Sequence, residues 1–107
     1  MKIPSPLFGR ETPPGVIRAR VLRSFDASLE RIHPEEANAV RGAVVRLLDA
    51  LQTGQRPAGL GVRKLRGRWW ECRSSLGRRI LFSLEHDLVT FVQAGTHDEI
   101  RRTLHRL

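Results

Sequence analysis

The sequence contains a single cysteine, no tyrosine and no long run of apolar residues. Cys72 alone excludes an intramolecular disulfide framework and a zinc site built on cysteines, so packing must stabilise the fold. No segment approaches the roughly 18 to 20 apolar residues that span a bilayer, and the first residues lack the apolar centre of a signal peptide. The histidines are scattered, without the spacing of a metal-ligand pair. We therefore expect a cytoplasmic protein, in a reducing compartment, that uses no metal or other cofactor and does not enter a membrane.

The length and composition fit one small domain. The chain has 107 residues, of which 40% are hydrophobic, enough for one modest core. Four of the six prolines and two glycines lie in the first 15 residues, a composition that resists regular structure. We expect residues 1–15 to form a flexible proline-rich arm and residues 16–107 to form a single domain.

Positive charge is concentrated in one stretch of the chain. Nineteen lysines and arginines oppose eleven acidic residues, which gives a formal net charge of +8. Seven of the basic residues lie between Arg63 and Arg79, with only Glu71 against them. Such a density is typical of a surface that binds phosphate groups. A solvated arginine-rich face is the alternative interpretation.

The apolar periodicity predicts a strand followed by two helices. Residues 16–23 partly alternate apolar and basic side chains, which favours a short strand over a helical start. Ser24 is in position to cap a helix that ends near Ile32. Pro34 suits the first turn of a longer helix, and Gly54, directly after its last residue, ends it. The two helices are expected to form a helical hairpin.

The second half of the chain predicts a meander of short strands. The expected strands cover about residues 62–66, 69–74, 78–84 and 88–94. The turns between them are short enough for antiparallel hairpins. Thr96 is then in position to cap a terminal helix. The fold class is therefore expected to be α+β, with one N-terminal strand, a helical hairpin, a three- to four-stranded antiparallel meander and a short C-terminal helix.

Strand alternation gathers charged residues on one face of this meander. Successive side chains of a strand point to opposite faces of the sheet. Placing Trp70 and Cys72 in the core therefore puts Glu71 and Arg73 on the other face, together with Arg79 of the next strand. This basic face is expected to be open. A purely structural interpretation is that Glu71 offsets cross-strand arginines, at about 0.2 to 1 kcal/mol per pair.

Two further positions extend this candidate site. If Leu65 points inward on the first strand of the meander, Lys64 and Arg66 share the basic face, although a slip of one residue would reverse every facing. His97 follows the last strand directly, where its ring would reach over the sheet edge. Histidine suits proton transfer near neutral pH, but a single histidine is more often structural.

From about Ser24 onward, four motifs occur in the order and spacing of one known family. They are Ser24-Phe25 at the first helix, Lys64-Leu65-Arg66-Gly67 before the meander, WWECRSSLGRRILF over residues 69–82, and AGTHDEI over residues 94–100. In this arrangement the chain resembles the RelE/ParE toxin superfamily, the toxins of type II toxin–antitoxin pairs. The last motif resembles the ending of YafQ-like and plasmid-stabilisation members. The resemblance covers about four fifths of the chain.

The resemblance implies the same fold and two alternative activities. RelE-like members are metal-independent endoribonucleases that cleave mRNA in the ribosomal A site, whereas ParE-like members inhibit DNA gyrase without cutting RNA. Several members carry a tyrosine or a further basic residue near the C-terminus, and this chain has no tyrosine. The gyrase inhibitor therefore stays open, as does a noncatalytic RNA-binding module. The expected partners are mRNA, the ribosome and a cognate antitoxin that binds the toxin in a hetero-oligomer.

The resemblance also implies a role for individual residues. Arg73 and Arg79 match strand arginines that stabilise the reacting phosphate, and His97 matches a terminal histidine that acts as acid or base. Glu71 is a second candidate base. The residues expected to hold the nucleic-acid backbone are Arg63, Lys64, Arg66, Arg68 and Arg78.

Overall fold

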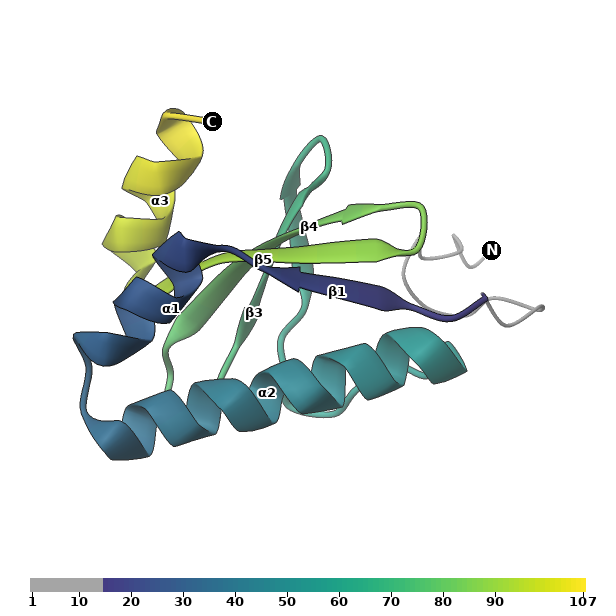
Figure 1. Cartoon of the computed structure of the whole chain (residues 1–107), viewed down its shortest axis with the longest axis horizontal. Coiled ribbons are helices and arrows are strands. Elements are labelled where there is room, and N and C mark those ends of the chain that lie inside the picture. The colour runs from purple at the N-terminus through teal and green to yellow at the C-terminus, as the bar shows by residue number, and fades with distance from the viewer. Residues whose placement is uncertain (1–14) are drawn as a thin grey trace.

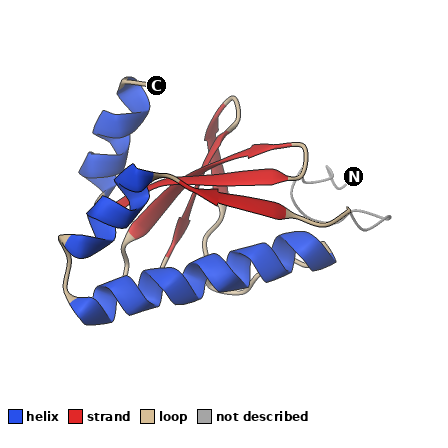
Figure 2. Ribbon diagram, viewed as in Figure 1, coloured by secondary structure: helices blue, strands red, loops and turns tan. Residues whose placement is uncertain are grey.

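The computed structural model describes residues 15–107 as three helices and five strands (Figures 1 and 2). The expected proline-rich arm, residues 1–15, lies outside the described residues except for Gly15. The elements are, in chain order, β1 (Arg18–Val21), α1 (Arg23–Glu30), α2 (Pro34–Thr53), β2 (Arg63–Arg66), β3 (Trp69–Arg73), β4 (Arg79–Glu85), β5 (Leu88–Gly95) and α3 (His97–His105).

The five strands form one sheet in the order β1-β5-β4-β3-β2. β2 to β5 make an antiparallel meander, and β1 pairs in parallel with β5. β1 and β2 therefore lie at the two edges of the sheet. The expected α+β class, the helical hairpin, the meander and the C-terminal helix are all confirmed.

The ends of α2 confirm the local signals in the sequence. Pro34 is the first residue of the helix, where its missing N–H is no loss. His33 caps this end, because its ring nitrogen accepts from the backbone N–H of Glu35 at 3.2 Å. Gly54 ends the helix with a φ of 76°, a left-handed conformation that glycine adopts without steric cost.

The start of α1 corrects the sequence-based prediction. The helix begins at Arg23, and the capping position is Leu22, which is extended and provides no side-chain cap. Ser24 lies inside the first turn, and its hydroxyl donates to the carbonyl oxygen of Val92 on β5 at 2.6 Å. The expected N-cap at Ser24 is thus wrong, because this side chain joins the helix to the sheet instead of closing the helix end.

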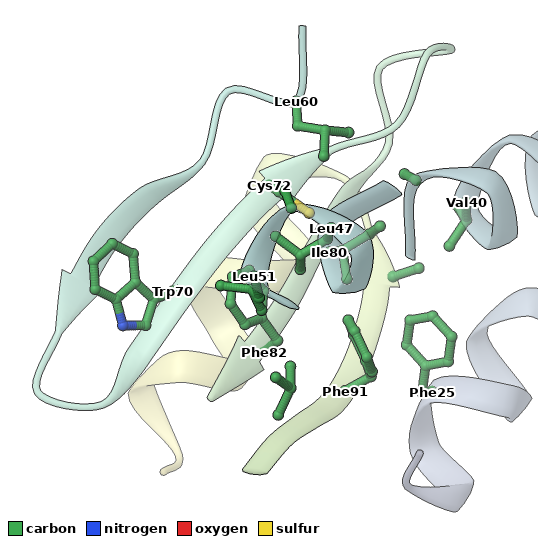
Figure 3. Close-up of a cluster of buried hydrophobic side chains, with 14 of the residues drawn as sticks. Phe25, Val40, Leu47, Leu51, Leu60, Trp70, Cys72, Ile80, Phe82 and Phe91 are labelled. Carbon is green, nitrogen blue, oxygen red and sulfur yellow. The ribbon is translucent and has the colours of Figure 1, made fainter. Parts of the chain in front are cut away.

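The main hydrophobic core lies between α2 and one face of the sheet (Figures 1 and 3). Leu47 and Leu51 of α2 pack there with Phe82 and Phe91 of the sheet, and all four side chains are inaccessible to solvent. Burying one such side chain stabilises the fold by about 1.5 to 3 kcal/mol. Trp70, 8% exposed, lies at the β3 side of this core, so the expected inward facing of β3 is confirmed.

The opposite face of the sheet is partly covered by α3. Ile100 of this helix packs on Leu81 and Val92 in a second, smaller cluster. Leu65 and Trp69 are partly buried against the same cluster. The face was expected to be open, but α3 covers part of it, because its apolar residues need the same sheet surface.

Within residues 15–107, none of the helices combines the length and the apolar character that crossing a bilayer requires.

Candidate functional site

A cavity of about 380 Å³ lies between β2 and α3. It is lined by both sheet and helix residues, and most of its polar side chains are basic. The polar lining residues are Arg63, Lys64, Arg66, Glu71, His97, Arg101 and His105, and the apolar ones are Leu65, Ile100 and Leu104. We call this space the first cavity. Its charge favours an anionic occupant.

A buried carboxylate at the wall of the first cavity, that of Glu71, holds two arginines, of which Arg63 lines the cavity and Arg79 does not. Arg63 is the cross-strand partner of Glu71, and its Nε donates to Glu71 Oε2 at 2.8 Å. Arg79 on β4 donates from Nη1 to the same oxygen at 2.7 Å. The side chain of Glu71 is 3% exposed, whereas those of Arg79 and Arg63 are 24% and 56% exposed. A buried carboxylate is stable only when charged or hydrogen-bonding groups compensate it. Its two bonds also hold both guanidinium groups in place.

The facing of β2 differs from the sequence-based expectation. Lys64 lies opposite Trp70, with its ammonium nitrogen 6.0 Å from the centre of the indole ring, and not opposite Glu71. Leu65 points toward α3 and the second apolar cluster, and not into the main core. The expectation for Lys64 is wrong because the structure places Arg63 in register with Glu71. Lys64 nevertheless lines the first cavity.

Arg66 does reach the expected face, because the pairing of β2 shifts by one residue between Lys64 and Arg66. Arg66 consequently pairs with Trp69 and points toward α3. Its Nη2 donates to the carbonyl oxygen of Leu104 at 2.7 Å. A cation at the last carbonyls of a helix complements the helix dipole, so Arg66 stabilises the end of α3 while it lines the cavity.

His97 enters the first cavity from the start of α3. Thr96 caps this helix as expected, since its hydroxyl accepts from the Glu99 backbone N–H at 3.2 Å and the Glu99 side chain accepts from the Thr96 N–H at 2.8 Å. The Nε2 of His97 accepts from Nε of Arg101, one turn later, at 2.8 Å. In this arrangement the ring carries its proton on Nδ1. His97 and Glu71, far apart in sequence, thus line the same cavity.

The Arg73 side chain lies against the loop before β2. A Cβ added to Gly61 would stand 3.0 Å from the Arg73 Nε, so the guanidinium lies directly beside that glycine. The backbone N–H of Arg73 donates to the carbonyl oxygen of Leu60 at 2.7 Å, which holds the loop in place. Arg73 and Arg79 are paired across β3 and β4, but the Arg73 guanidinium lies against Gly61, whereas that of Arg79 bonds to Glu71.

Arg68 is another predicted site residue that is outside the first cavity. Its guanidinium lies 5.1 Å from the centre of the Trp69 ring. Its Nη1 donates to Glu85 at 2.9 Å in an exposed ion pair. Exposed pairs of this kind contribute little to stability.

Arg78 joins the starts of two helices. Its Nε donates to Glu36 of α2 at 2.6 Å, and its Nη1 lies 3.9 Å from Glu99 of α3. The hydrogen bond from Arg78 lowers the pKa of Glu36 below its ordinary value, and the Thr96 backbone N–H does most to lower the pKa of Glu99. The bond to Glu36 raises the pKa of Arg78 in turn. Arg78 is thus a structural link in this conformation.

The sequence-based prediction missed two polar residues of the first cavity, together with its three apolar ones. Arg101 and His105 follow His97 at intervals of four residues, so all three share one face of α3. That spacing is a signal that the sequence carries. Among residues 15–107 there is no group of three or more histidine, cysteine, aspartate or glutamate side chains that could hold a metal ion.

The fold is shared with toxins of known structure. No protein-family model matches the chain, and no curated protein matches it in sequence. The Escherichia coli DinJ–YafQ toxin–antitoxin complex matches with a TM-score of 0.59 at 15% identity, over 79% of this chain and 98% of the other. The Methanococcus jannaschii RelB–RelE antitoxin–toxin complex matches with a TM-score of 0.59 at 12% identity, over 78% and 96%.

A third solved structure gives the same result. The Mycobacterium tuberculosis toxin–antitoxin complex RelBE2 matches with a TM-score of 0.51 at 17% identity, over 80% of this chain and all of the other. Identities this low establish the fold alone. The chain has the fold of RelE-like toxins, which confirms the resemblance seen in the sequence motifs.

Proposed function

We propose that this chain is the toxin of a type II toxin–antitoxin pair and that it cleaves mRNA on the ribosome as a metal-independent endoribonuclease in the cytoplasm. The observation that carries this proposal is the first cavity, where His97 lies among Arg63, Arg66 and Arg101 in a fold of RelE-like toxins. The phosphate backbone of RNA supplies the negative charge that such a cavity attracts.

The reaction would use the RNA's own 2′-hydroxyl as the nucleophile. A base takes the hydroxyl proton, the 2′-oxygen bonds to the adjacent phosphorus, and the bond from phosphorus to the 5′-oxygen breaks as an acid protonates the leaving oxygen. The products are a 2′,3′-cyclic phosphate and a 5′-hydroxyl. The extra negative charge on the phosphorane needs fixed cations, which Arg63, Arg66 and Arg101 would supply.

His97 is the candidate for proton transfer. Its Nε2 accepts from Arg101 at 2.8 Å without RNA. A bound phosphate would compete for the Arg101 guanidinium and free Nε2, so that substrate binding would prepare the ring for its role. His105 lines the same cavity and is the second histidine there, a residue type often used in proton transfer.

Glu71 suits a positioning role better than that of a base. Its side chain is 3% exposed, and its Oε2 already accepts from Arg63 and Arg79. We therefore assign to Glu71 the task of holding Arg63 at the cavity wall, with Arg79 as the second cation that keeps the carboxylate in place. This replaces the role of base that the sequence suggested for Glu71.

An antitoxin would be the natural partner of this surface. The solved YafQ and RelE structures with the same fold are complexes with DinJ and RelB. With a formal charge of +8, this chain would bind an acidic partner protein that covers the first cavity.

The test is to induce the chain in a bacterial host and to map mRNA 5′ ends while growth is followed. The wild type is compared with His97→Ala, and His86→Asn serves as the matched histidine control. His86 lies in the exposed turn between β4 and β5 at a φ of 54°, which asparagine tolerates. Circular dichroism of the purified variants checks the fold.

New 5′ ends inside translated codons that vanish in His97→Ala and persist in His86→Asn are the expected result. Growth arrest without new ends would contradict the nuclease and indicate a gyrase inhibitor. No arrest and no new ends would contradict the toxin and indicate a noncatalytic RNA-binding module.

A further inference from the structure

A second cavity, of about 350 Å³, lies beside the first on β2. Within residues 15–107, Arg56, Arg63 and Lys64 line it, and no acidic residue of that range does. Trp70 and Pro57 contribute apolar surface. The proposed cleavage chemistry does not use Arg56 or this second cavity.

Arg73 lies next to the second cavity without lining it. Gly61 lines the cavity, and the Arg73 guanidinium lies against it. Gly61 has a φ of 55°, and an added Cβ would come within 3.0 Å of the Arg73 Nε. Glycine therefore serves two needs at this position, the left-handed backbone and the close approach of the arginine.

The two cavities are continuous along the edge strand. Arg63 and Lys64 line both of them, and within the described sheet β2 has a neighbour on one side only, β3. The cations of this strand are thus distributed over both of its faces. A molecule that lies across the strand can contact both cavities at once.

We propose that the second cavity binds a phosphodiester group of the same single-stranded RNA whose reacting phosphate occupies the first cavity. The inference rests on the proposed function and adds the path of the strand. RNA carries one negative charge at every nucleotide, and this regular charge matches cations that follow both faces of a four-residue strand. Trp70 would give a base limited apolar contact, because only 8% of its surface is exposed.

The test measures the binding of fluorescent single-stranded RNA by anisotropy, with His97→Ala as the background so that no RNA is cut. Two lengths are used: about three nucleotides, which fill the first cavity only, and roughly ten, within the usual range of single-strand sites. Arg56→Gln removes a cation that lines the second cavity and not the first. Arg41→Gln, on the exposed side of α2, removes the same charge elsewhere and is the matched control.

The long RNA should bind the Arg56→Gln protein roughly tenfold more weakly, as expected for a lost contact to a charged group. The slope of log affinity against log salt concentration should fall by about 0.7, the contribution of one phosphate contact to a single strand. The affinity for the short RNA should not change, and Arg41→Gln should change the affinity for neither length.

Trp70 reports on the second cavity directly. In a Trp69→Phe background it is the remaining tryptophan, so long RNA should quench its fluorescence and short RNA should not. Equal affinity of the long RNA for Arg56→Gln and Arg41→Gln, with Trp70 unquenched, would overturn the second site while leaving the nuclease intact. Failure of the protein with His97 intact to cut an RNA that it binds would refute the proposed function instead. Competition by an acidic peptide, without RNA binding to the second cavity, would overturn the proposal in favour of a protein partner.

Discussion

Removing the Glu71 carboxylate should destabilise the fold more than removing either arginine that it accepts from. Breaking a buried ion pair by deleting one partner costs about 3 to 5 kcal/mol when the remaining charge stays buried. Here the remaining charges are Arg79, 24% exposed, and Arg63, 56% exposed, so water can solvate both in part. We therefore expect Glu71→Ala to cost about 3 kcal/mol. In a domain of this size that lowers the melting temperature by roughly 12 °C or more.

Urea unfolding, followed by tryptophan fluorescence and circular dichroism, measures this cost. Glu71→Gln keeps the shape and one acceptor and should cost about 1 to 3 kcal/mol, as for a weakened buried hydrogen bond. Arg63→Ala should cost about 1 kcal/mol or less, because more than half of its side chain is exposed. The reasoning is refuted if Glu71→Ala unfolds within 1 kcal/mol of the wild type, or if Arg63→Ala costs as much as Glu71→Ala, since either result means that the carboxylate does not organise the cluster.

Three further predictions concern the supports of the site. Ser28→Ala should cost about 1 to 3 kcal/mol in urea unfolding, because the buried hydroxyl accepts from a β5 backbone N–H that then loses its partner. Gly61→Ala should lower the free energy of unfolding more than Gly59→Ala. Both glycines have a positive φ, but only a Cβ at Gly61 would have a neighbouring side chain within 4 Å. Equal losses of stability would show that the neighbouring side chain moves aside at no cost. The hydrogen bond from Arg78 lowers the pKa of Glu36, so the contribution of this pair to stability is present above the ordinary pKa of 4.5 and is lost as pH falls through the lowered pKa. Arg78→Gln should therefore be less stable than the wild type at neutral pH, with a difference that shrinks below about pH 4.5; a constant difference would contradict this.

The elements of the fold were predictable because local chemistry determines their ends. α2 begins at Pro34 and ends before Gly54 as the sequence indicates, since a missing N–H and a left-handed residue act within one helical turn. The turns of the meander are equally local. The start of α1 was not predictable in this way. Ser24 resembles a cap, but its hydroxyl bonds to β5, which lies 68 residues away in sequence.

The candidate site was predictable in part. The residues that the prediction missed are brought to the site by long-range packing. Alternation on β3 correctly placed Glu71 opposite the core. The facing of β2 was wrong because Leu65 packs against Ile100 of α3, and no local signal indicates that contact. Arg101 belongs to the same helix and enters the cavity with it. The sequence predicted the helix, but its position over the sheet depends on tertiary packing.

The irregular pairing of β2 explains why one short strand serves two cavities. In a regular strand, Arg63 and Leu65 would share one face, and Lys64 and Arg66 the other. In the structure Lys64 pairs with Trp70 and Arg66 with the preceding residue of β3, so Leu65 is the extra residue of a bulge. The bulge returns Arg66 to the side of α3, where Arg63 already lies, and leaves Lys64 facing the other way. A bulge adds one residue to a strand and leaves no mark in the amino-acid composition, so hydrophobic alternation alone cannot reveal it. The bulge nevertheless determines which cation lines which cavity.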